Sequence, residues 1–365
     1  MLKTTIVLSL LIACAPLRAE RQTANVILVT LDGVRIQELF SGLDPLLAEH
    51  SESVDYSDIE LARERYWRDT PEARRGVLMP FFWKTLAPKG IVLGNKDKGS
   101  SVKVRNGILW SSPGYSEMLT GEPQSDVIDN TLVRYPHRTF LEYVRAELEL
   151  EPQQVAQFGS WDGFKLIAAS RDDAFFMNGA YDPIPLHLGS PEMDYLSALR
   201  PQIMELWEES ANDVITFRLA RAYLQKNRPR MMWLAFGQSD DWAHGDRYDR
   251  LLDYLHLVDS LLGDLWQTLQ SMDAYQGKTT LVLTTDHGRG LTGDDWIEHD
   301  AAIPGSDDIW VAVIGPDTPD RGEAAQTATV YQSDVAATVL QFFGLDAKAF
   351  NPDAGPPIPG TLSAK

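Results

Sequence analysis

The sequence predicts an α/β fold in which a mostly parallel central sheet is flanked by helices on both faces. Segments 25–31, 230–236 and 279–284 are runs of apolar and β-branched residues without helical spacing. Such runs are typical of strands that are buried on both faces. Each run ends at an acidic turn, and helical patterns follow the first two. The repeated order of strand, acidic turn and helix indicates a parallel sheet with helices packed on it.

The other elements follow from local patterns along the chain. A helix is expected to begin at Val34, after the first strand. Further helices are expected at about 79–86, 139–148, 193–209, 211–226, 247–270 and 333–343, and strands at 91–94, 102–105, 153–158 and 309–314. The helix at 247–270 has the clearest support, because its apolar residues recur at helical spacing.

Two segments differ in composition from the rest of the chain. Residues 44–75 are highly charged, which indicates helices and loops, and residues 159–200 combine aromatic residues with prolines, which indicates irregular structure over the sheet edge. We therefore expect one domain over residues 20–365, with inserted cap segments at about 44–105 and 159–226.

Charge excludes one class of function. The chain has 365 residues, with 33 basic and 52 acidic side chains and a formal net charge of −19. This balance argues against binding nucleic acid through a basic surface. An acidic protein that acts on an anionic substrate needs local positive charge at its site, and bound cations can supply it.

The first nineteen residues are expected to be an export signal. Lys3 precedes the apolar segment 4–13, which is too short to span a bilayer. Two processing sites fit: cleavage after Ala19, or a bacterial lipobox that ends at Cys14 and would attach a lipid there. Both place the mature protein outside the cytoplasm, periplasmic or secreted, and the second provides its only expected link to a membrane. Cys14 is the single cysteine, so no intramolecular disulfide can form.

Metal-binding residue types stand at the ends of the predicted strands. Asp32-Gly33 follows the first strand, and Asp286-His287-Gly288 follows the third. Ligands bind at this edge of open α/β sheets, and carboxylate plus imidazole suits a divalent metal. Other interpretations are a plain Asp-Gly turn at Asp32, and a helix-capping Asp286 beside a surface His287.

Ser111 precedes a predicted helix with Pro113 in its first turn. The exposed amides of such a turn can hold an anion. The Ser111 hydroxyl is therefore either a helix N-cap or a nucleophile that faces a phosphate-like group. Spacing alone favours the N-cap.

Four motifs together resemble the alkaline phosphatase superfamily, most closely its phosphodiesterase/phosphatase-like and phosphoglycerate-mutase-like branches. They are Asp32-Gly33, Ser111-x-Pro113, Asp240-x-x-x-His244, and Asp286-His287-Gly288 with His299 beyond. The resemblance extends to the 331–340 segment, which is similar to the closing "D-I-A-P-T" element of the superfamily. Ala337 stands there in place of the usual Pro.

The resemblance implies an alkaline-phosphatase-like catalytic domain with two divalent metal sites, most simply zinc, with manganese as the alternative. One site would consist of Asp32, Asp286 and His287 together with Ser111, and the other of Asp240, His244 and His299. Ser111 would attack the phosphorus of a small phosphate ester and form a phosphoseryl intermediate. Asn130 resembles an asparagine that contacts a phosphate oxygen in the phosphodiesterase branch. Asp241 is expected outside the metal shell.

Departures from family patterns leave other functions open. Sulfatases of the superfamily have Cys/Ser-x-Pro-x-Arg, whereas this chain has Tyr115 in place of the Arg. A sulfatase or a phosphonate hydrolase on the same fold is the alternative enzyme. A catalytically silent metal-binding relative is the alternative outside enzymes. The chain is short for the mutase branch, which carries a large inserted domain, and only the segments 44–105 and 159–226 are available as caps.

Overall fold

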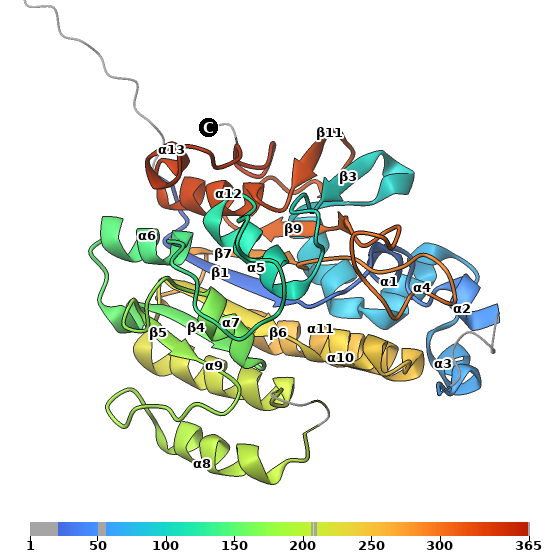
Figure 1. The fold of residues 1–365 in the computed structure, drawn as a ribbon, viewed down its shortest axis with the longest axis horizontal. Helices are drawn as coiled ribbons and strands as arrows, with labels where there is room; N and C mark the ends of the chain where they lie inside the picture. The colour runs from blue at the N-terminus through green and yellow to red at the C-terminus, as the bar shows by residue number, and fades with distance from the viewer. Residues whose placement is uncertain (1–20, 50–55, 206, 208–209, 364–365) are drawn as a thin grey trace, which may run out of the picture.

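The computed structural model describes residues 21–49, 56–205, 207 and 210–363, and its centre is an eight-stranded sheet. The strand order is β10-β2-β9-β7-β1-β6-β4-β5 (Figure 1). The strands are β1 (Asn25–Leu31), β2 (Gly90–Leu93), β4 (Val155–Gly159), β5 (Phe176–Asn178), β6 (Met231–Phe236), β7 (Thr279–Thr284), β9 (Val311–Ile314) and β10 (Gly322–Glu323). The α/β fold class predicted from the sequence is confirmed.

The three strands that carry the acidic turns lie side by side. β1 pairs in parallel with β6 on one side and with β7 on the other, and Val29 lies opposite both Leu234 and Leu283. This register brings the carboxyl ends of all three strands to one edge of the sheet. β9 is antiparallel to both β2 and β7, so the sheet is mostly but not entirely parallel.

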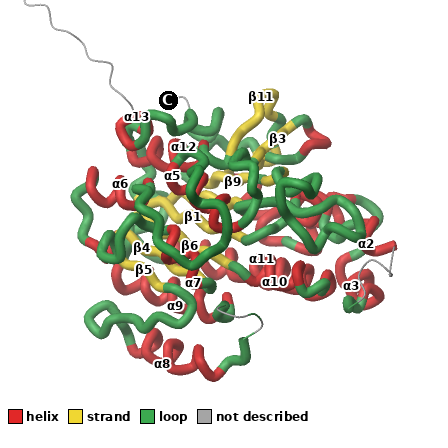
Figure 2. Tube along the Cα trace, in the orientation of Figure 1, coloured by secondary structure: helices red, strands yellow, loops and turns green. Residues whose placement is uncertain are grey.

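Helices cover both faces of the sheet, as Figure 2 shows with helices on either side of the strand layer. One apolar core is shared by β1 and helices that include α1 (Ile36–Ser41), α3 (Ile59–Tyr66), α4 (Pro71–Leu78), α9 (Asp213–Asn227) and α11 (Tyr248–Gln270). The opposite core contains α5 (Ser111–Thr120), α6 (Phe140–Glu147), α7 (Asp162–Ile167) and α12 (Asp334–Phe343). Along β1, Ile27 and Val29 enter the first core, while Val26 and Leu28 enter the second. This alternation is what a strand buried on both faces requires.

Smaller elements complete the fold. A second sheet has the order β11-β3-β8, with β3 at Ser100–Lys103, β8 at Asp308–Ile309 and β11 at Gln326–Tyr331. The remaining helices are α2 (Pro45–Glu49), α8 (Pro191–Leu199), α10 (Gln238–His244) and α13 (Ala347–Phe350), with π or 3-10 turns at Phe82–Leu86, Ala87–Lys89, Lys96–Lys98, Pro152–Gln154 and Arg200–Gln202.

The structure differs from the sequence prediction in several elements. The helix expected at 193–209 ends at Leu199, because Pro201 lacks the N–H that a continuing helix needs. Residues 159–200, expected to be irregular, contain α7, β5 and α8, and β5 joins the central sheet. β5 is three residues long, too short to show a periodic pattern. The turn expected around Asp240 is the short helix α10.

The predicted export signal and Cys14 lie outside the described residues. In the part of the chain that the structure describes, no helix is long and apolar enough to cross a membrane.

Candidate active site

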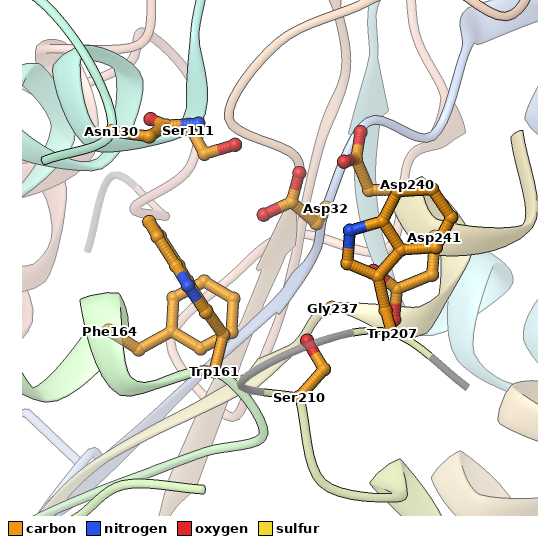
Figure 3. A pocket seen from close by; sticks show the side chains of 10 residues that line it. All are labelled: Asp32, Ser111, Asn130, Trp161, Phe164, Trp207, Ser210, Gly237, Asp240 and Asp241. Atoms are coloured by element: carbon orange, nitrogen blue, oxygen red, sulfur yellow. The ribbon is translucent and has the colours of Figure 1, made fainter. Parts of the chain in front are cut away.

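A polar pocket opens where β1, β6 and β7 end. Its cavity volume is about 350 Å³. The residues that line it are Asp32, Ser111, Asn130, Trp161, Phe164, Trp207, Ser210, Gly237, Asp240 and Asp241. Figure 3 shows the Ser111 hydroxyl and the Asp32 carboxylate pointing into the space between Trp161 and Trp207. The predicted nucleophile, two of the predicted metal ligands and Asn130 therefore face one cavity.

Asp32, Asp286 and His287 form the first cluster of ligand-type side chains. One ligand atom from each lies within 4.8 Å of the others. His287 Nε2 is 3.4 Å from Asp32 Oδ1 and 3.4 Å from Asp286 Oδ2. His287 Nδ1 donates a hydrogen bond to the Gly288 carbonyl at 2.9 Å, so Nε2 is the ring nitrogen that faces the carboxylates.

Two carboxylate oxygens of the first cluster lack hydrogen-bond donors. All three residues are buried, and Asp32 Oδ1 and Asp286 Oδ2 accept no hydrogen bond from any residue that the structure describes. Burial and the neighbouring Asp32 raise the pKa of Asp286 to about 8. Burial would lower the pKa of His287, but Asp286 and Asp32 outweigh it and raise that pKa to about 9. Buried carboxylate oxygens without partners are costly, and a divalent cation would relieve this cost, so the donor set fits a metal.

Asp240, His244 and His299 form the second cluster. α10 places Asp240 and His244 on one helix face, four residues apart, with Asp240 Oδ2 3.3 Å from His244 Nε2. His244 Nε2 lies 3.1 Å from His299 Nε2. Burial and His287 lower the pKa of His244, and the same two causes lower the pKa of His299. Both imidazoles are therefore neutral at pH 7, which is the form that binds metals.

The two clusters are adjacent. The His287 and His299 rings are stacked, with centroids 3.7 Å apart. Asp240 Oδ1 is 3.9 Å from Nε2 of each of these histidines. Ligand atoms of Asp240, His287 and His299 also satisfy the spacing for one ion. All six metal ligands predicted from the sequence thus converge on one site.

Ser111 begins helix α5 beside the first cluster. Its Oγ lies 3.5 Å from His287 Nε2. Trp110 is the N-cap residue of α5, and it makes no side-chain capping bond. The N-cap interpretation of Ser111 is therefore wrong, because the helix begins at this residue and its hydroxyl faces the site. Asn130 Oδ1 accepts the Ser112 backbone N–H at 2.8 Å, which leaves the Asn130 amide NH₂ group for the pocket.

Two glycines allow the elements of the site to meet. Gly33 has φ +62°, and a Cβ there would lie 2.7 Å from Asp240 Oδ1. A Cβ on Gly114 would lie 2.6 Å from the Asp286 carbonyl oxygen. Glycine at 33 therefore admits Asp240 to the end of β1, and glycine at 114 lets α5 pack against the end of β7.

The loop before Ser111 contains residues that the sequence prediction missed. Leu109 has φ +63°, and its carbonyl accepts a hydrogen bond from His299 Nδ1 at 2.8 Å. Asn106 Oδ1 accepts the backbone N–H groups of Ile108 and Leu109, both at 2.9 Å. The buried Glu117 accepts from Asn106 Nδ2 at 3.2 Å. The Asn-Gly dipeptide at 106–107 is a turn signal, but it does not indicate which side chain the turn serves.

Arg289 is a second residue that the motif did not single out. Its guanidinium is buried and forms an ion pair with Asp240. Its Nη1 donates to the Ile297 carbonyl at 2.5 Å. The ion pair involves Asp240 Oδ1, so Oδ2 remains directed at His244.

Aromatic side chains form the walls of the pocket. The Trp161 ring lies against Gly163, where a Cβ would approach it to 2.2 Å, and it meets Phe164 edge-on at 5.4 Å between centroids. Trp207 lies near His244. The pocket-lining residues that the structure describes include no Lys or Arg. Burial and Asp213 raise the pKa of Asp241 to about 8.

Comparison with solved structures defines the class of fold. A mutant of alkaline phosphatase PafA matches with a TM-score of 0.59 and 9% identity, over 94% of this chain and 99% of that one. The phosphonate monoester hydrolase SpPMH from Silicibacter pomeroyi matches with a TM-score of 0.54 and 10% identity, over 93% and 76%. A putative sulfatase from Bacteroides thetaiotaomicron matches with a TM-score of 0.53 and 13% identity, over 91% and 75%. The fold is that of the alkaline phosphatase superfamily.

The family is narrower than the fold. The model of the type I phosphodiesterase / nucleotide pyrophosphatase family matches residues 82–338, more than half of the chain. The chain belongs to this family. The matched segment contains Ser111 and five of the six candidate ligands, and Asp32 lies before it. A search of curated proteins finds no match to this chain.

Proposed function

We propose that this protein is a metal-dependent hydrolase of phosphate diesters that uses Ser111 as its nucleophile. The observation that carries the proposal is the position of Ser111 beside the first cluster, where Asp32 Oδ1 and Asp286 Oδ2 are buried and accept no hydrogen bond from the described residues, with the second cluster adjacent to it. Family membership supports the same reaction class.

Asp32, Asp286 and His287 would hold one divalent cation, and Asp240, His244 and His299 the other. Mixed oxygen and nitrogen ligation suits zinc, with manganese as the alternative. When bound, such cations lower the pKa of a coordinated hydroxyl or water and offset the charge that develops on phosphoryl oxygens.

The chain's own groups then define the reaction. Ser111 Oγ attacks phosphorus, the P–O bond to one ester group breaks, and that group departs as an alcohol with a proton, leaving a phosphoseryl ester that retains the second ester group. Water then attacks this phosphorus and breaks its bond to Ser111 Oγ, which releases the phosphate monoester and restores the Ser111 hydroxyl. The Asn130 NH₂ group lies where it can donate to a phosphoryl oxygen.

Charge favours a diester over a monoester. A phosphate monoester carries close to two negative charges at pH 7 and a diester carries one. The lining includes the Asp32 and Asp240 carboxyl groups and, among the described residues, no Lys or Arg, so the two proposed cations would have to offset the whole charge of the substrate. Trp161 and Trp207 provide apolar walls for the second ester group, which a monoester lacks.

A panel of substrates tests this proposal. We expect the zinc-loaded enzyme to hydrolyse an aryl phosphodiester with a higher kcat/KM than an aryl phosphate monoester or an aryl sulfate. A higher kcat/KM for the sulfate or for an aryl phosphonate would favour the alternative enzymes. No turnover of any substrate, with no bound metal, would favour a catalytically silent relative.

We also propose that the mature protein acts outside the cytoplasm, on the basis of residues 1–19. If Cys14 carries a lipid, Cys14→Ala should move the protein from the membrane fraction to the soluble fraction. An N-terminus at Glu20 by mass spectrometry would reject the lipid anchor. Recovery from the cytoplasm with residues 1–19 intact would reject export.

A further inference from the structure

The hydroxyl of Tyr115 touches one of the candidate metal ligands. Tyr115 Oη donates a hydrogen bond to Asp32 Oδ2 at 3.2 Å. Both residues are buried, and they are 83 positions apart in the chain. The other carboxylate oxygen, Asp32 Oδ1, is the one that faces His287 Nε2. The tyrosine therefore engages the oxygen that the first cluster does not use.

Two further buried residues lie behind the Tyr115 hydroxyl. Trp233 Nε1 can only donate, and it donates to Thr30 Oγ1 at 3.0 Å. The Thr30 hydroxyl also interacts with the Tyr115 hydroxyl. A carboxylate oxygen accepts, so Tyr115 donates its own proton to Asp32. Every residue of this chain of donors is buried, so water does not compete for its bonds.

Packing holds the ring that carries this hydroxyl. Tyr115 meets Phe164 edge-on, with centroids 5.1 Å apart, and lies 5.5 Å from Trp233. Tyr115 also follows Ser111 by four residues on α5, so both lie on one face of the same helix. The position of α5 thus determines both where the Ser111 hydroxyl lies and how the Asp32 carboxylate is oriented.

We propose that Tyr115 is the positioning residue of the first metal cluster: it holds Asp32 so that Oδ1 points to the cation that Asp286 and His287 share. This inference rests on the proposed function. Sulfatases of the superfamily have an arginine at the position of Tyr115. A tyrosine donates a hydrogen bond without adding positive charge, so the charge of the two carboxylates remains available to a divalent cation.

Tyr115→Phe removes one oxygen and leaves the packed ring in place. Zinc binding to the metal-stripped full chain would be measured by titration calorimetry. Turnover of an aryl phosphodiester would be measured separately at increasing zinc concentration. Losing an outer hydrogen bond to a metal ligand typically weakens binding about 10- to 100-fold. We expect this weakening for one of two zinc ions, with lower turnover at limiting zinc that excess zinc restores.

Tyr223→Phe is the matched control, because Tyr223 is equally buried and its hydroxyl donates to the Gln153 carbonyl at 3.0 Å, outside the pocket lining. It should bind zinc as the wild type does. Thr30→Val should weaken zinc binding in the same direction but less.

If Tyr115→Phe binds zinc with the affinity of the wild type, the positioning role of Tyr115 is overturned, while the proposed function is not affected. If Tyr115→Phe does not fold, unchanged zinc affinity in Thr30→Val would overturn that positioning role. A wild-type protein that takes up no zinc would overturn both this inference and the proposed function.

Discussion

Asn106 gives the sharpest test of how the loop before the nucleophile is built. Asn106→Ala removes two hydrogen bonds to the backbone of Ile108 and Leu109 and one to Glu117. At roughly 1 kcal/mol for each bond, the free energy of unfolding should fall by about 2–4 kcal/mol. For a chain of 365 residues this corresponds to a Tm lower by about 3–5 °C.

Stability is only half of the expected effect. Leu109 would no longer be held at φ +63°, a conformation that costs an ordinary residue about 1–2 kcal/mol. The Leu109 carbonyl would then no longer accept the hydrogen bond from His299 Nδ1, and the His299 ring would be less firmly oriented. We expect zinc affinity and turnover to fall more than the Tm change explains, with partial recovery in excess zinc.

Asn95→Ala is the control for Asn106→Ala. Asn95 Oδ1 accepts the Asp97 N–H at 3.0 Å, and its Nδ2 donates to Glu323 at 2.5 Å, without contact to the candidate site. This variant should lose stability and keep its zinc affinity. If Asn106→Ala melts earlier but binds zinc and turns over as the wild type does, the loop has no positioning role and the reasoning is refuted.

Two further predictions concern metal and pH. Removing metal with a chelator should abolish turnover and lower Tm, and added zinc should restore both, because a ligand that binds the folded state stabilises it; full activity in verified metal-free protein would contradict the two-metal assignment. Burial raises the pKa of Glu117 from 4.5 to about 7. The folded state therefore holds this proton more tightly than the unfolded state, so the contribution of Glu117 to stability is complete below pH 4.5 and is lost as pH rises to about 7. Urea unfolding of wild type and Glu117→Gln should show a stability difference that changes by about 3 kcal/mol across this range, and a constant difference would show that Glu117 is not the titrating group.

Residues that terminate strands could be predicted from the sequence alone. Asp32, Asp286 and His287 follow runs of buried apolar residues, and parallel strands place such residues at one edge. Asp240 and His244 were predicted from the resemblance to the alkaline phosphatase superfamily, whose spacing of four residues they match. The expected turn became a helix, which preserves that spacing and puts both side chains on one face.

Residues that act through tertiary contacts could not be predicted in this way. Tyr115 was noted only as a departure from the sulfatase pattern, because nothing local connects it with Asp32. Asn106 holds the backbone of Leu109, and nothing in the sequence indicates that a leucine at this position has a positive φ. From the sequence, a serine shortly before Pro113 fits a helix N-cap as well as a nucleophile. The structure distinguishes the two roles, because α5 begins at Ser111 and the Ser111 hydroxyl faces His287.

The most direct test of the central claim is the covalent step at Ser111. The wild-type enzyme would be mixed with an aryl phosphodiester whose phosphorus is labelled, quenched in acid within one turnover, and analysed by mass spectrometry beside Ser111→Ala and Ser112→Ala. Ser112 is buried next to Ser111 but does not line the pocket, so it is the matched control. We expect label on Ser111 in the wild type and in Ser112→Ala. We expect no label in Ser111→Ala, with turnover lower by about a thousandfold or more and bound zinc retained. Turnover near that of the wild type in Ser111→Ala would contradict the central claim.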